Sequence, residues 1–233
     1  MKNFSNAYIF LYAAGLVIVV AALLSFAAVQ LKPMQTKNIE NKKKQNILAS
    51  VNVESTATEA DVLYTKYITD SYVINNKGEK IEGDAFSMSM KKELTKSLEE
   101  MSLPVYEYTL DDGGKGVIVP MRGKGLGGAI WGFISFQEDM NTVVGTTFDH
   151  DAETPGLGAK ITLKWFQILF KDKKIFDETG KFVSIELLKG GKGAGNPHIV
   201  DAISGGTITS NGVDDMLEDC LVLYEPYFKN KGK

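Results

Sequence analysis

The 233-residue sequence is poor in the residues that most often carry metal and thiol chemistry, with only 1 Cys and 2 His. One Cys excludes an intramolecular disulfide and any metal site that needs several thiolates, and two His leave little for a His-rich metal centre. A basic surplus is also missing, because 26 Lys and Arg face 29 Asp and Glu, for a formal charge of −3. A mildly acidic chain argues against nucleic-acid binding. We therefore expect neither a metal nor a nucleic acid.

The overall composition is that of a folded protein. The chain is 44% hydrophobic and 24% charged, which are the proportions of an ordinary globular protein. These values exclude global disorder and a multi-span membrane chain. The length suits one or two domains and is sufficient for a hydrophobic core.

A long uncharged segment lies near the N-terminus, from Asn3 to Leu31. Its apolar part, Ala7 to Val29, is about 23 residues, or about 34 Å as a helix, which exceeds a bilayer core of ~30 Å. Tyr8 and Tyr12 suit the aromatic belt at a membrane interface. We predict a single-pass membrane anchor helix over residues 1–31.

A cleaved signal peptide is the alternative to a retained anchor. Such a peptide usually has a shorter apolar region and a small-x-small cleavage site. Ser25-Phe26-Ala27 resembles such a site, but the apolar run continues through Val29, which favours a retained span.

The flanking lysines bear on orientation. Lys2 precedes the span, whereas Lys32, Lys37 and the run Lys42–Lys44 follow it. The positive-inside rule therefore favours a cytoplasmic C-terminal part, although long domains translocate largely regardless of flanking charge.

Residues 32–50 are polar and rich in lysine, with Pro33 near their start. They form either a linker or the start of a polar helix that continues into Ile47, Leu48 and Val51. Residues 51–233 then form one mixed α+β domain.

Within that domain, Tyr72–Ile74 and Lys80–Ile81 flank an Asn75–Gly78 turn, which is hairpin chemistry. The last helix is expected over Gly212–Leu223, capped by Ser210 or Asn211, with Asp214 and Asp215 in its first turn. A helix is also expected over 91–101, strands over 106–110, 117–119, 130–136, 143–148 and 182–188, and a strand or a helix over 161–170.

Several familiar motifs are present only in part. Gly123–Gly128 lacks the βαβ setting of a dinucleotide fingerprint, and Gly190–Gly193 lacks the Walker spacing. Ser204 has no nucleophile elbow around it, and His150 and His198 have no companion signature. Cys220 is more typical of an apolar core residue than of a nucleophile.

Two other loops suggest a binding site. In the loop from His150 to Gly158, Gly156 and Gly158 would allow a planar ligand to approach the backbone, but Pro-Gly is also a simple surface turn. The segment Asp201–Ser210 is a turn of small residues that enters a helix. It suits either a phosphate, bound by hydroxyls and unpaired N–H groups, or an N-capping role for Ser and Thr.

The sequence Asp201-Ala-Ile-Ser204-Gly205-Gly206-Thr207 resembles the Asp-x-x-Ser/Thr-Gly-Ala-Thr motif of the covalent FMN-binding domain family. The loop Glu153-Thr-Pro-Gly-Leu-Gly158 and the stretch Gly123–Phe133 are similar to two further hallmarks, in the same order. Within that family the chain resembles the C subunits of the sodium-translocating NADH:quinone oxidoreductases. The runner-up is the G subunit of RNF-type ferredoxin:NAD complexes.

The resemblance implies that the phosphate of FMN is esterified to the Thr207 hydroxyl by a flavin transferase. It also implies that a set of further residues contacts or shapes the cofactor site. These are Asp201, Ser204, Gly205, Gly206, Glu153, Thr154, Gly156, Leu157, Gly158, Gly125, Leu126 and Lys160.

The implied function is electron relay between redox centres of neighbouring subunits in a sodium-pumping complex of the bacterial inner membrane. The complex is an NADH:quinone reductase, and this chain alone would hold no complete active site. The domain is then expected on the periplasmic side, against the lysine count. A stand-alone membrane-tethered flavin domain is a further alternative.

Two positions depart from the family pattern. Gly206 stands where Ala is usual, and Gly127 stands where relatives often have an aromatic residue. Trp131 or a partner subunit would then have to cover that face of the flavin.

Overall fold

The computed structural model describes residues 5–232, so Met1–Phe4 of the predicted anchor and Lys233 lie outside the described part. The chain divides into two compact units, residues 1–43 and residues 44–233. Each unit is considered separately below.

The first unit consists of the N-terminal part of α1 (Asn6–Ser50), which is long and apolar enough to cross a membrane. The polar residues that follow the apolar run continue the same helix, with Pro33 inside it. Of the two alternatives for residues 32–50, the structure therefore has the helix rather than a linker. Lysine, which occurs five times there, is a good helix former.

The last residues of α1 belong to the second unit, because their apolar side chains are buried. Ile47 and Leu48 are fully buried, and Val51 is 2% exposed. Each such side chain contributes about 1.5–3 kcal/mol by leaving water. The Ser50 carbonyl also accepts a hydrogen bond from Ser135 Oγ at 2.6 Å. The folded unit thus begins at residue 44, before the expected start at residue 51.

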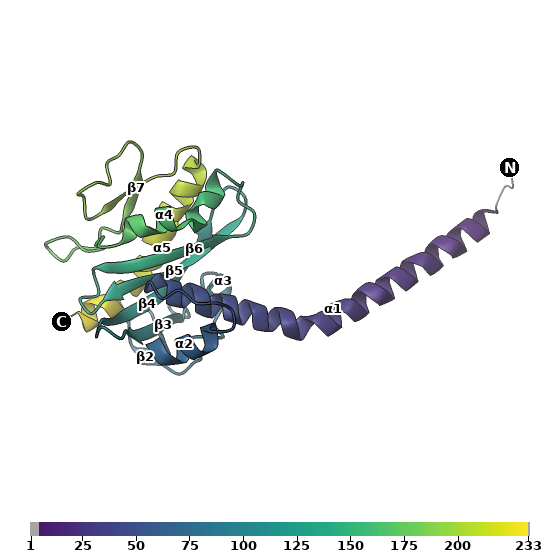
Figure 1. Cartoon of the computed structure of the whole chain (residues 1–233), viewed down its shortest axis with the longest axis horizontal. Helices are drawn as coiled ribbons and strands as arrows, with labels where there is room; N and C mark the ends of the chain where they lie inside the picture. Colours follow the sequence, from purple (N-terminus) through teal and green to yellow (C-terminus); the bar gives the residue numbers. More distant parts are fainter. Residues whose placement is uncertain (1–4, 233) are drawn as a thin grey trace. The chain divides into compact units, whose positions relative to one another are not determined.

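The second unit is built on an antiparallel six-stranded sheet with the order β2-β1-β3-β4-β5-β6. Figure 1 shows β3, β4, β5 and β6 in this order. The predicted hairpin is confirmed, because Ile74 pairs with Lys80 across the Asn75–Gly78 turn. The strands are β1 (Ile68–Ile74), β2 (Lys80–Ile81), β3 (Leu103–Thr109), β4 (Lys115–Lys124), β5 (Ala129–Gln137) and β6 (Val143–His150).

The sheet separates two hydrophobic cores, because alternate residues of a strand point to opposite faces. In β4, Val117 and Val119 pack on one side with the C-terminal helix α5 (Thr207–Lys231), and Ile118 packs on the other. The second core contains the end of α1, Tyr106 and Phe133. Both faces are therefore covered, and the strands read as nearly continuous apolar runs.

The remaining elements are short. They are the helices α2 (Ala60–Tyr67), α3 (Met90–Glu93) and α4 (Lys164–Gln167), the 3-10 helices η1 (Gly158–Thr162) and η2 (Ile168–Phe170), and the parallel pair β7 (Glu186–Leu188) and β8 (Ile199–Asp201). The region 161–170, left open between strand and helix, is thus helical. Its Phe166 and Phe170 are fully buried in the core that contains α5.

Two predicted elements were too long. The helix expected over 91–101 ends at Glu93, whose buried carboxylate accepts the Ser102 N–H and turns the chain back. The strand expected over 182–188 is reduced to β7, because Ser184 has a φ of +58°, in the left-handed region that interrupts a strand.

The last helix was predicted too short and with the wrong cap. It begins at Thr207, and Gly206 is its N-cap without a side-chain cap. The Ser210 hydroxyl lies inside the helix and accepts the Ile203 N–H at 3.0 Å. Asp214 is not in the first turn, and its carboxylate accepts the Leu187 N–H at 2.8 Å. Burial raises the pKa of Asp214.

Candidate functional site

The segment Asp201–Ser210 connects the end of β8 to the start of α5. Gly205 has a φ of +78°, a conformation that side chains other than glycine rarely adopt. The Gly206 N–H donates to the Ile203 carbonyl at 3.0 Å and closes the turn. Thr207 therefore lies immediately after this turn, as the first residue of the 25-residue helix α5.

This helix start offers unpaired donors. The N–H groups of Thr207, Ile208 and Thr209 have no acceptor within the helix, because they belong to its first turn. Together with the helix dipole, such groups favour an anion. The Thr207 hydroxyl is half-buried and has no hydrogen-bond partner among residues 5–232.

The helix start opens onto a cavity of ≈ 200 Å³. Its walls come from three separate stretches of the chain, namely the glycine turn after β4, the loop before η1 and the first turn of α5. The lining residues are Leu126, Glu153, Thr154, Leu157, Gly158, Gly205, Gly206, Thr207, Ile208 and Thr209.

Close contacts explain the glycines in these walls. A Cβ at Gly158 would lie 2.0 Å from Glu153 Oε2 and 2.3 Å from Thr209 Oγ1. A Cβ at Gly127 would lie 2.1 Å from the Ala152 carbonyl oxygen. Side chains at these positions would force the loops apart, so the space depends on glycine.

Glu153 is buried at the centre of these loops, with 5% of its surface exposed. Its Oε1 accepts the Gly127 N–H at 2.8 Å, and its Oε2 accepts the Thr209 hydroxyl at 2.6 Å. The Glu153 N–H donates to His150 Nδ1 at 3.2 Å. One carboxylate thus joins the glycine turn, the loop before η1 and α5.

Three apolar side chains on the cavity wall are exposed to solvent. Leu126 is 63% exposed, Leu157 44% and Ile208 57%. Large apolar side chains are normally exposed singly rather than around one opening. Their grouping suits a flat aromatic ligand that would cover them.

Close packing of α5 against β4 holds the helix in place. A Cβ at Gly123 would lie 2.7 Å from Met216 Cβ, and one at Gly212 would lie 2.3 Å from the Lys124 carbonyl oxygen. Cys220 is fully buried in this contact, with Sγ 3.4 Å from the Arg122 nitrogen and oxygen. Desolvation raises the pKa of Cys220 to about 11, which suits the expected core role.

The structure does not place every predicted site residue on the cavity wall. Asp201 accepts the Gly193 N–H at 3.0 Å, and the Gly125 N–H donates to the Gly128 carbonyl at 2.8 Å. Trp131 lies on β5, with the Arg122 guanidinium 5.8 Å from its ring centre. Ser204, Gly156 and Lys160 also lie outside the lining.

Sequence reasoning included Thr209 only within the segment Asp201–Ser210 and gave Ile208 no role of its own, yet both line the cavity beside Thr207. It also missed the contacts of Gly212 with β4. The signal for Ile208 and Thr209 was their place in the first helical turn, which a helix start at Gly212 concealed.

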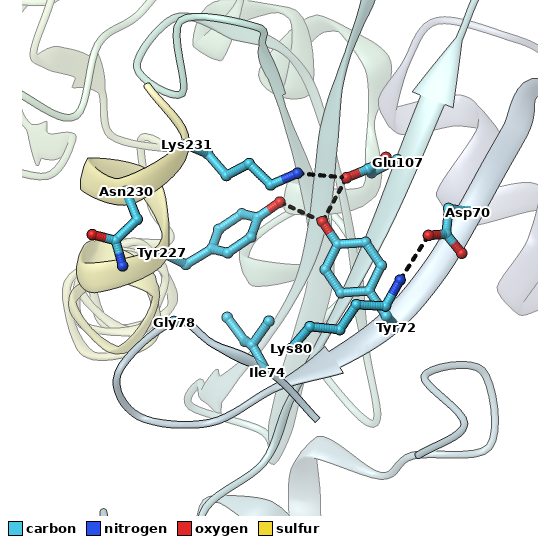
Figure 2. Close-up of a pocket in the computed structure, with 9 residues that line it drawn as sticks. All are labelled: Asp70, Tyr72, Ile74, Gly78, Lys80, Glu107, Tyr227, Asn230 and Lys231. Carbon is cyan, nitrogen blue, oxygen red and sulfur yellow. Dashed lines mark hydrogen bonds and ion pairs between the residues drawn. The ribbon is translucent and has the colours of Figure 1, made fainter. Parts of the chain in front are cut away.

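A second cavity, of ≈ 440 Å³, lies at the other end of α5 (Figure 2). There the Tyr72 hydroxyl lies 2.6 Å from Glu107 Oε1 and 2.7 Å from the Tyr227 hydroxyl, and Lys231 Nζ lies 3.2 Å from the same Glu107 oxygen. Lys80 pairs with Asp70 across the opening at 2.9 Å. These polar side chains of the cavity therefore form hydrogen bonds and ion pairs with one another.

Comparisons with known proteins concern the part of the chain that holds the first cavity. A family model described as an FMN-binding domain matches residues 125–222. The match includes every residue that lines the 200 Å³ cavity.

Curated relatives match over most of their length. The C subunit of the Na⁺-translocating NADH-quinone reductase of Vibrio vulnificus is 31% identical over 215 residues, covering 85% of this chain and 84% of the relative. The C subunit of the same enzyme from Neisseria meningitidis is 33% identical over 230 residues, covering 91% and 87%.

Solved structures show the same fold. The crystal structure of the Na⁺-translocating NADH-quinone reductase C subunit from Parabacteroides distasonis has a TM-score of 0.79 and 42% identity, over 85% of this chain and 96% of that chain. Shewanella oneidensis NqrC gives a TM-score of 0.70 at 27% identity, over 82% and 96%. The predicted α+β domain after an apolar N-terminal helix is thereby confirmed.

Proposed function

This chain belongs to the family of the C subunits of the Na⁺-translocating NADH-quinone reductases, and on that premise we propose that it carries FMN bound as a phosphoester of Thr207. It is the electron-carrying FMN subunit of the enzyme complex. The observation that supports the attachment point is the unpaired Thr207 hydroxyl at the start of α5, in a cavity lined by the residues of the family model.

The residues present fit the phosphate of FMN. The first-turn N–H groups of α5 are donors without an intrahelical acceptor, and the positive end of the helix dipole favours a negative charge. The Gly205–Gly206 turn presents no side chain between Thr207 and an incoming phosphate. These groups would hold and orient a phosphate on the Thr207 oxygen.

The residues also fit the ring system. Leu126, Leu157 and Ile208 provide an apolar wall, and Gly158 allows the loop to pack directly against Glu153 and Thr209. Sites that bury a whole ligand of this size usually have ≈ 300–1,000 Å³, so a cavity of ≈ 200 Å³ leaves part of the flavin uncovered. A partner subunit would cover the remainder, where Gly127 has no room for an aromatic side chain.

Attachment is a balanced group transfer. The Thr207 Oγ1–phosphorus bond forms while the pyrophosphate bond of a flavin dinucleotide breaks. A nucleoside monophosphate leaves, and a base in a flavin transferase takes the hydroxyl proton. When bound, FMN accepts and releases one or two electrons, and the protein supplies its position and surroundings.

The subunit would relay these electrons between redox centres of neighbouring subunits in the membrane. We place the FMN domain on the periplasmic side, with α1 as a single-pass anchor. A covalent bond suits that location, because a cofactor lost outside the cell membrane is not easily recovered. The lysines after the span favour the opposite orientation, but they do not decide it for a long translocated domain.

Expression with and without the flavin transferase tests the attachment. We expect a fluorescent band on a denaturing gel, and the added mass of one FMN less one water, only with the transferase. Thr207→Ala should remain folded and carry no flavin, whereas Thr207→Ser keeps a hydroxyl and should carry it. A fluorescent Thr207→Ala band, or an unlabelled wild-type protein, would contradict the attachment at Thr207.

A further inference from the structure

Thr207 and Thr209 line the same cavity on the first turn of α5, and within residues 5–232 only the Thr207 hydroxyl lacks a partner. We propose that Glu153 selects Thr207 as the attachment residue by engaging the hydroxyl of Thr209. This specificity-determining role rests on the proposed function, because it concerns which of two neighbouring residues receives the flavin phosphate.

The surroundings of the two hydroxyls differ sharply. Thr209 is 1% exposed and donates to Glu153 Oε2 at 2.6 Å. A hydroxyl bound to a buried carboxylate forms a strong, charge-assisted hydrogen bond. Thr207 is half-buried, and its hydroxyl has no partner among the described residues. The free hydroxyl is therefore the one that can attack a phosphorus atom.

Glu153 is held in position for this role. The Gly127 N–H fixes Oε1 at 2.8 Å. A Cβ at Gly125 would lie 2.3 Å from Oε1, and a Cβ at Gly158 would lie 2.0 Å from Oε2. The carboxylate thus occupies the space that side chains at two glycines would need, and it has little freedom to release Thr209.

Charge acts in the same direction. A phosphate on Thr209 would place its negative oxygens beside the Glu153 carboxylate, in a site with little water to screen the repulsion. A phosphate on Thr207 avoids the atom that Glu153 binds and remains next to the first-turn N–H groups.

The test maps the flavin by peptide mass spectrometry after reaction with the transferase and a flavin dinucleotide. Wild type should carry flavin on Thr207 alone, and Thr207→Ala should carry none. Adding Glu153→Ala to Thr207→Ala should move flavin to Thr209, with labelling roughly tenfold or more above the background signal of the single variant. Glu153→Gln keeps the side-chain volume and should give a smaller increase in the same direction.

Asp214→Asn in the Thr207→Ala background is the matched control. Asp214 also braces α5 by accepting a backbone N–H, but it does not touch Thr209. This variant should remain unlabelled. If Asp214→Asn gave as much labelling as Glu153→Ala, Glu153 would only stabilise the fold. That result would overturn the proposal that Glu153 selects Thr207.

Two further outcomes separate the hypotheses. Flavin on Thr209 in the Thr207→Ala protein would overturn the selection by Glu153, and the attachment of wild type at Thr207 would stand. A folded Thr207→Ala/Glu153→Ala protein without label would overturn it as well. Wild type without covalent flavin would remove the proposed function and this inference together.

A measurement without flavin gives an independent check. Hydrogen exchange of the Gly127 amide should be slow in wild type and in Asp214→Asn, and faster in Glu153→Ala, which lacks the acceptor. Equal protection of this amide in Glu153→Ala would contradict the anchoring of Glu153.

Discussion

The two ends of α5 each border a cavity, and they use their polar groups in opposite ways. At the N-terminal end the cavity is ≈ 200 Å³, and the Thr207 hydroxyl and the first-turn N–H groups are available. At the C-terminal end the cavity is ≈ 440 Å³, but Tyr72, Tyr227, Glu107 and Lys231 bind one another (Figure 2).

The difference shows that volume alone does not identify a binding site. A ligand at the larger cavity would have to replace hydrogen bonds and ion pairs that already exist, and each lost partner costs free energy. A phosphate at the smaller cavity would instead satisfy donors that lack acceptors. We therefore regard the C-terminal end as a structural clamp between α5, β1 and β3.

Gly158→Ala should have the largest effect, because it disturbs the cavity at the N-terminal end of α5 and leaves the cavity at the C-terminal end unchanged. The new Cβ would lie 2.0 Å from Glu153 Oε2, so we expect a loss of about 2–3 kcal/mol in the free energy of unfolding and a marked loss of FMN attachment. Urea unfolding and the intact mass after transferase treatment measure the two effects.

Gly156→Ala is the control for this change. Its Cβ would have nothing within 4 Å, so only the strain of φ +78° applies, about 1–2 kcal/mol. Attachment of FMN at the wild-type level in a fully stable Gly158→Ala protein would show that the cavity does not depend on this glycine.

Alkaline pH should reduce the stability that the buried tyrosines at the C-terminal end of α5 provide. Burial raises the pKa of Tyr227 from 10.0 to about 12, and burial followed by the bond to Glu107 raises that of Tyr72 further. Between pH 10 and 12 the unfolded chain therefore ionises Tyr227 before the folded protein does, so stability present below pH 10 is lost as the pH rises. We expect Tyr227 alone to contribute about 2–3 kcal/mol of this loss.

Unfolding by urea at several pH values checks this expectation. Other buried tyrosines contribute to the total loss, so the comparison is with the Tyr72→Phe/Tyr227→Phe protein, whose stability should fall less steeply above pH 10. If the free energy of unfolding fell equally steeply with pH in the two proteins, the stabilising role of Tyr72 and Tyr227 would be contradicted.

Tyr72→Phe alone should cost less at neutral pH. The change removes the hydroxyl that joins Glu107 to Tyr227, with a loss of about 1–2 kcal/mol in the free energy of unfolding. FMN attachment should equal that of wild type, because the site lies at the other end of α5. A reduced flavin content in a folded Tyr72→Phe protein would break the separation between the two ends.

Gly206→Ala should have the smallest effect. Gly206 has a φ of −113°, and its added Cβ would lie 3.1 Å from Ile203 Cγ2, so alanine fits with slight adjustment. We expect a stability change within about 1 kcal/mol and full FMN attachment. Gly205→Ala is the contrast, because φ is +78° and the Cβ would lie 3.0 Å from Leu157 Cδ2.

Local sequence rules predicted the elements whose cause is local. The apolar run from Ala7 to Val29 has the length of a membrane-crossing helix, and the structure has it in α1. The Asn75–Gly78 turn carries the residues that a tight turn needs, and it connects the expected strands. Alternating apolar residues predicted β3, and a nearly continuous apolar run predicted β5.

The errors arose where distant contacts override local preference. Ser210 is a good cap in isolation, but in the fold its hydroxyl accepts the Ile203 N–H and α5 begins earlier. Phe182 has strand propensity, yet the left-handed Ser184 ends its extension. For residues 32–50 the sequence left a linker and a helix open, and burial of Ile47 and Leu48 favours the helix at their C-terminal end.

The sequence by itself determined the apolar N-terminal helix, the hairpin turn and the three motifs that resemble a flavin-binding family. Only the tertiary structure decided that these motifs meet in one cavity, that Glu153 binds Gly127 and Thr209, and that Thr207 remains free. The physical reason is the distance along the chain between the residues that interact. Turns and helices follow from neighbouring residues, whereas the state of a hydroxyl depends on an acceptor that lies more than fifty residues away along the chain.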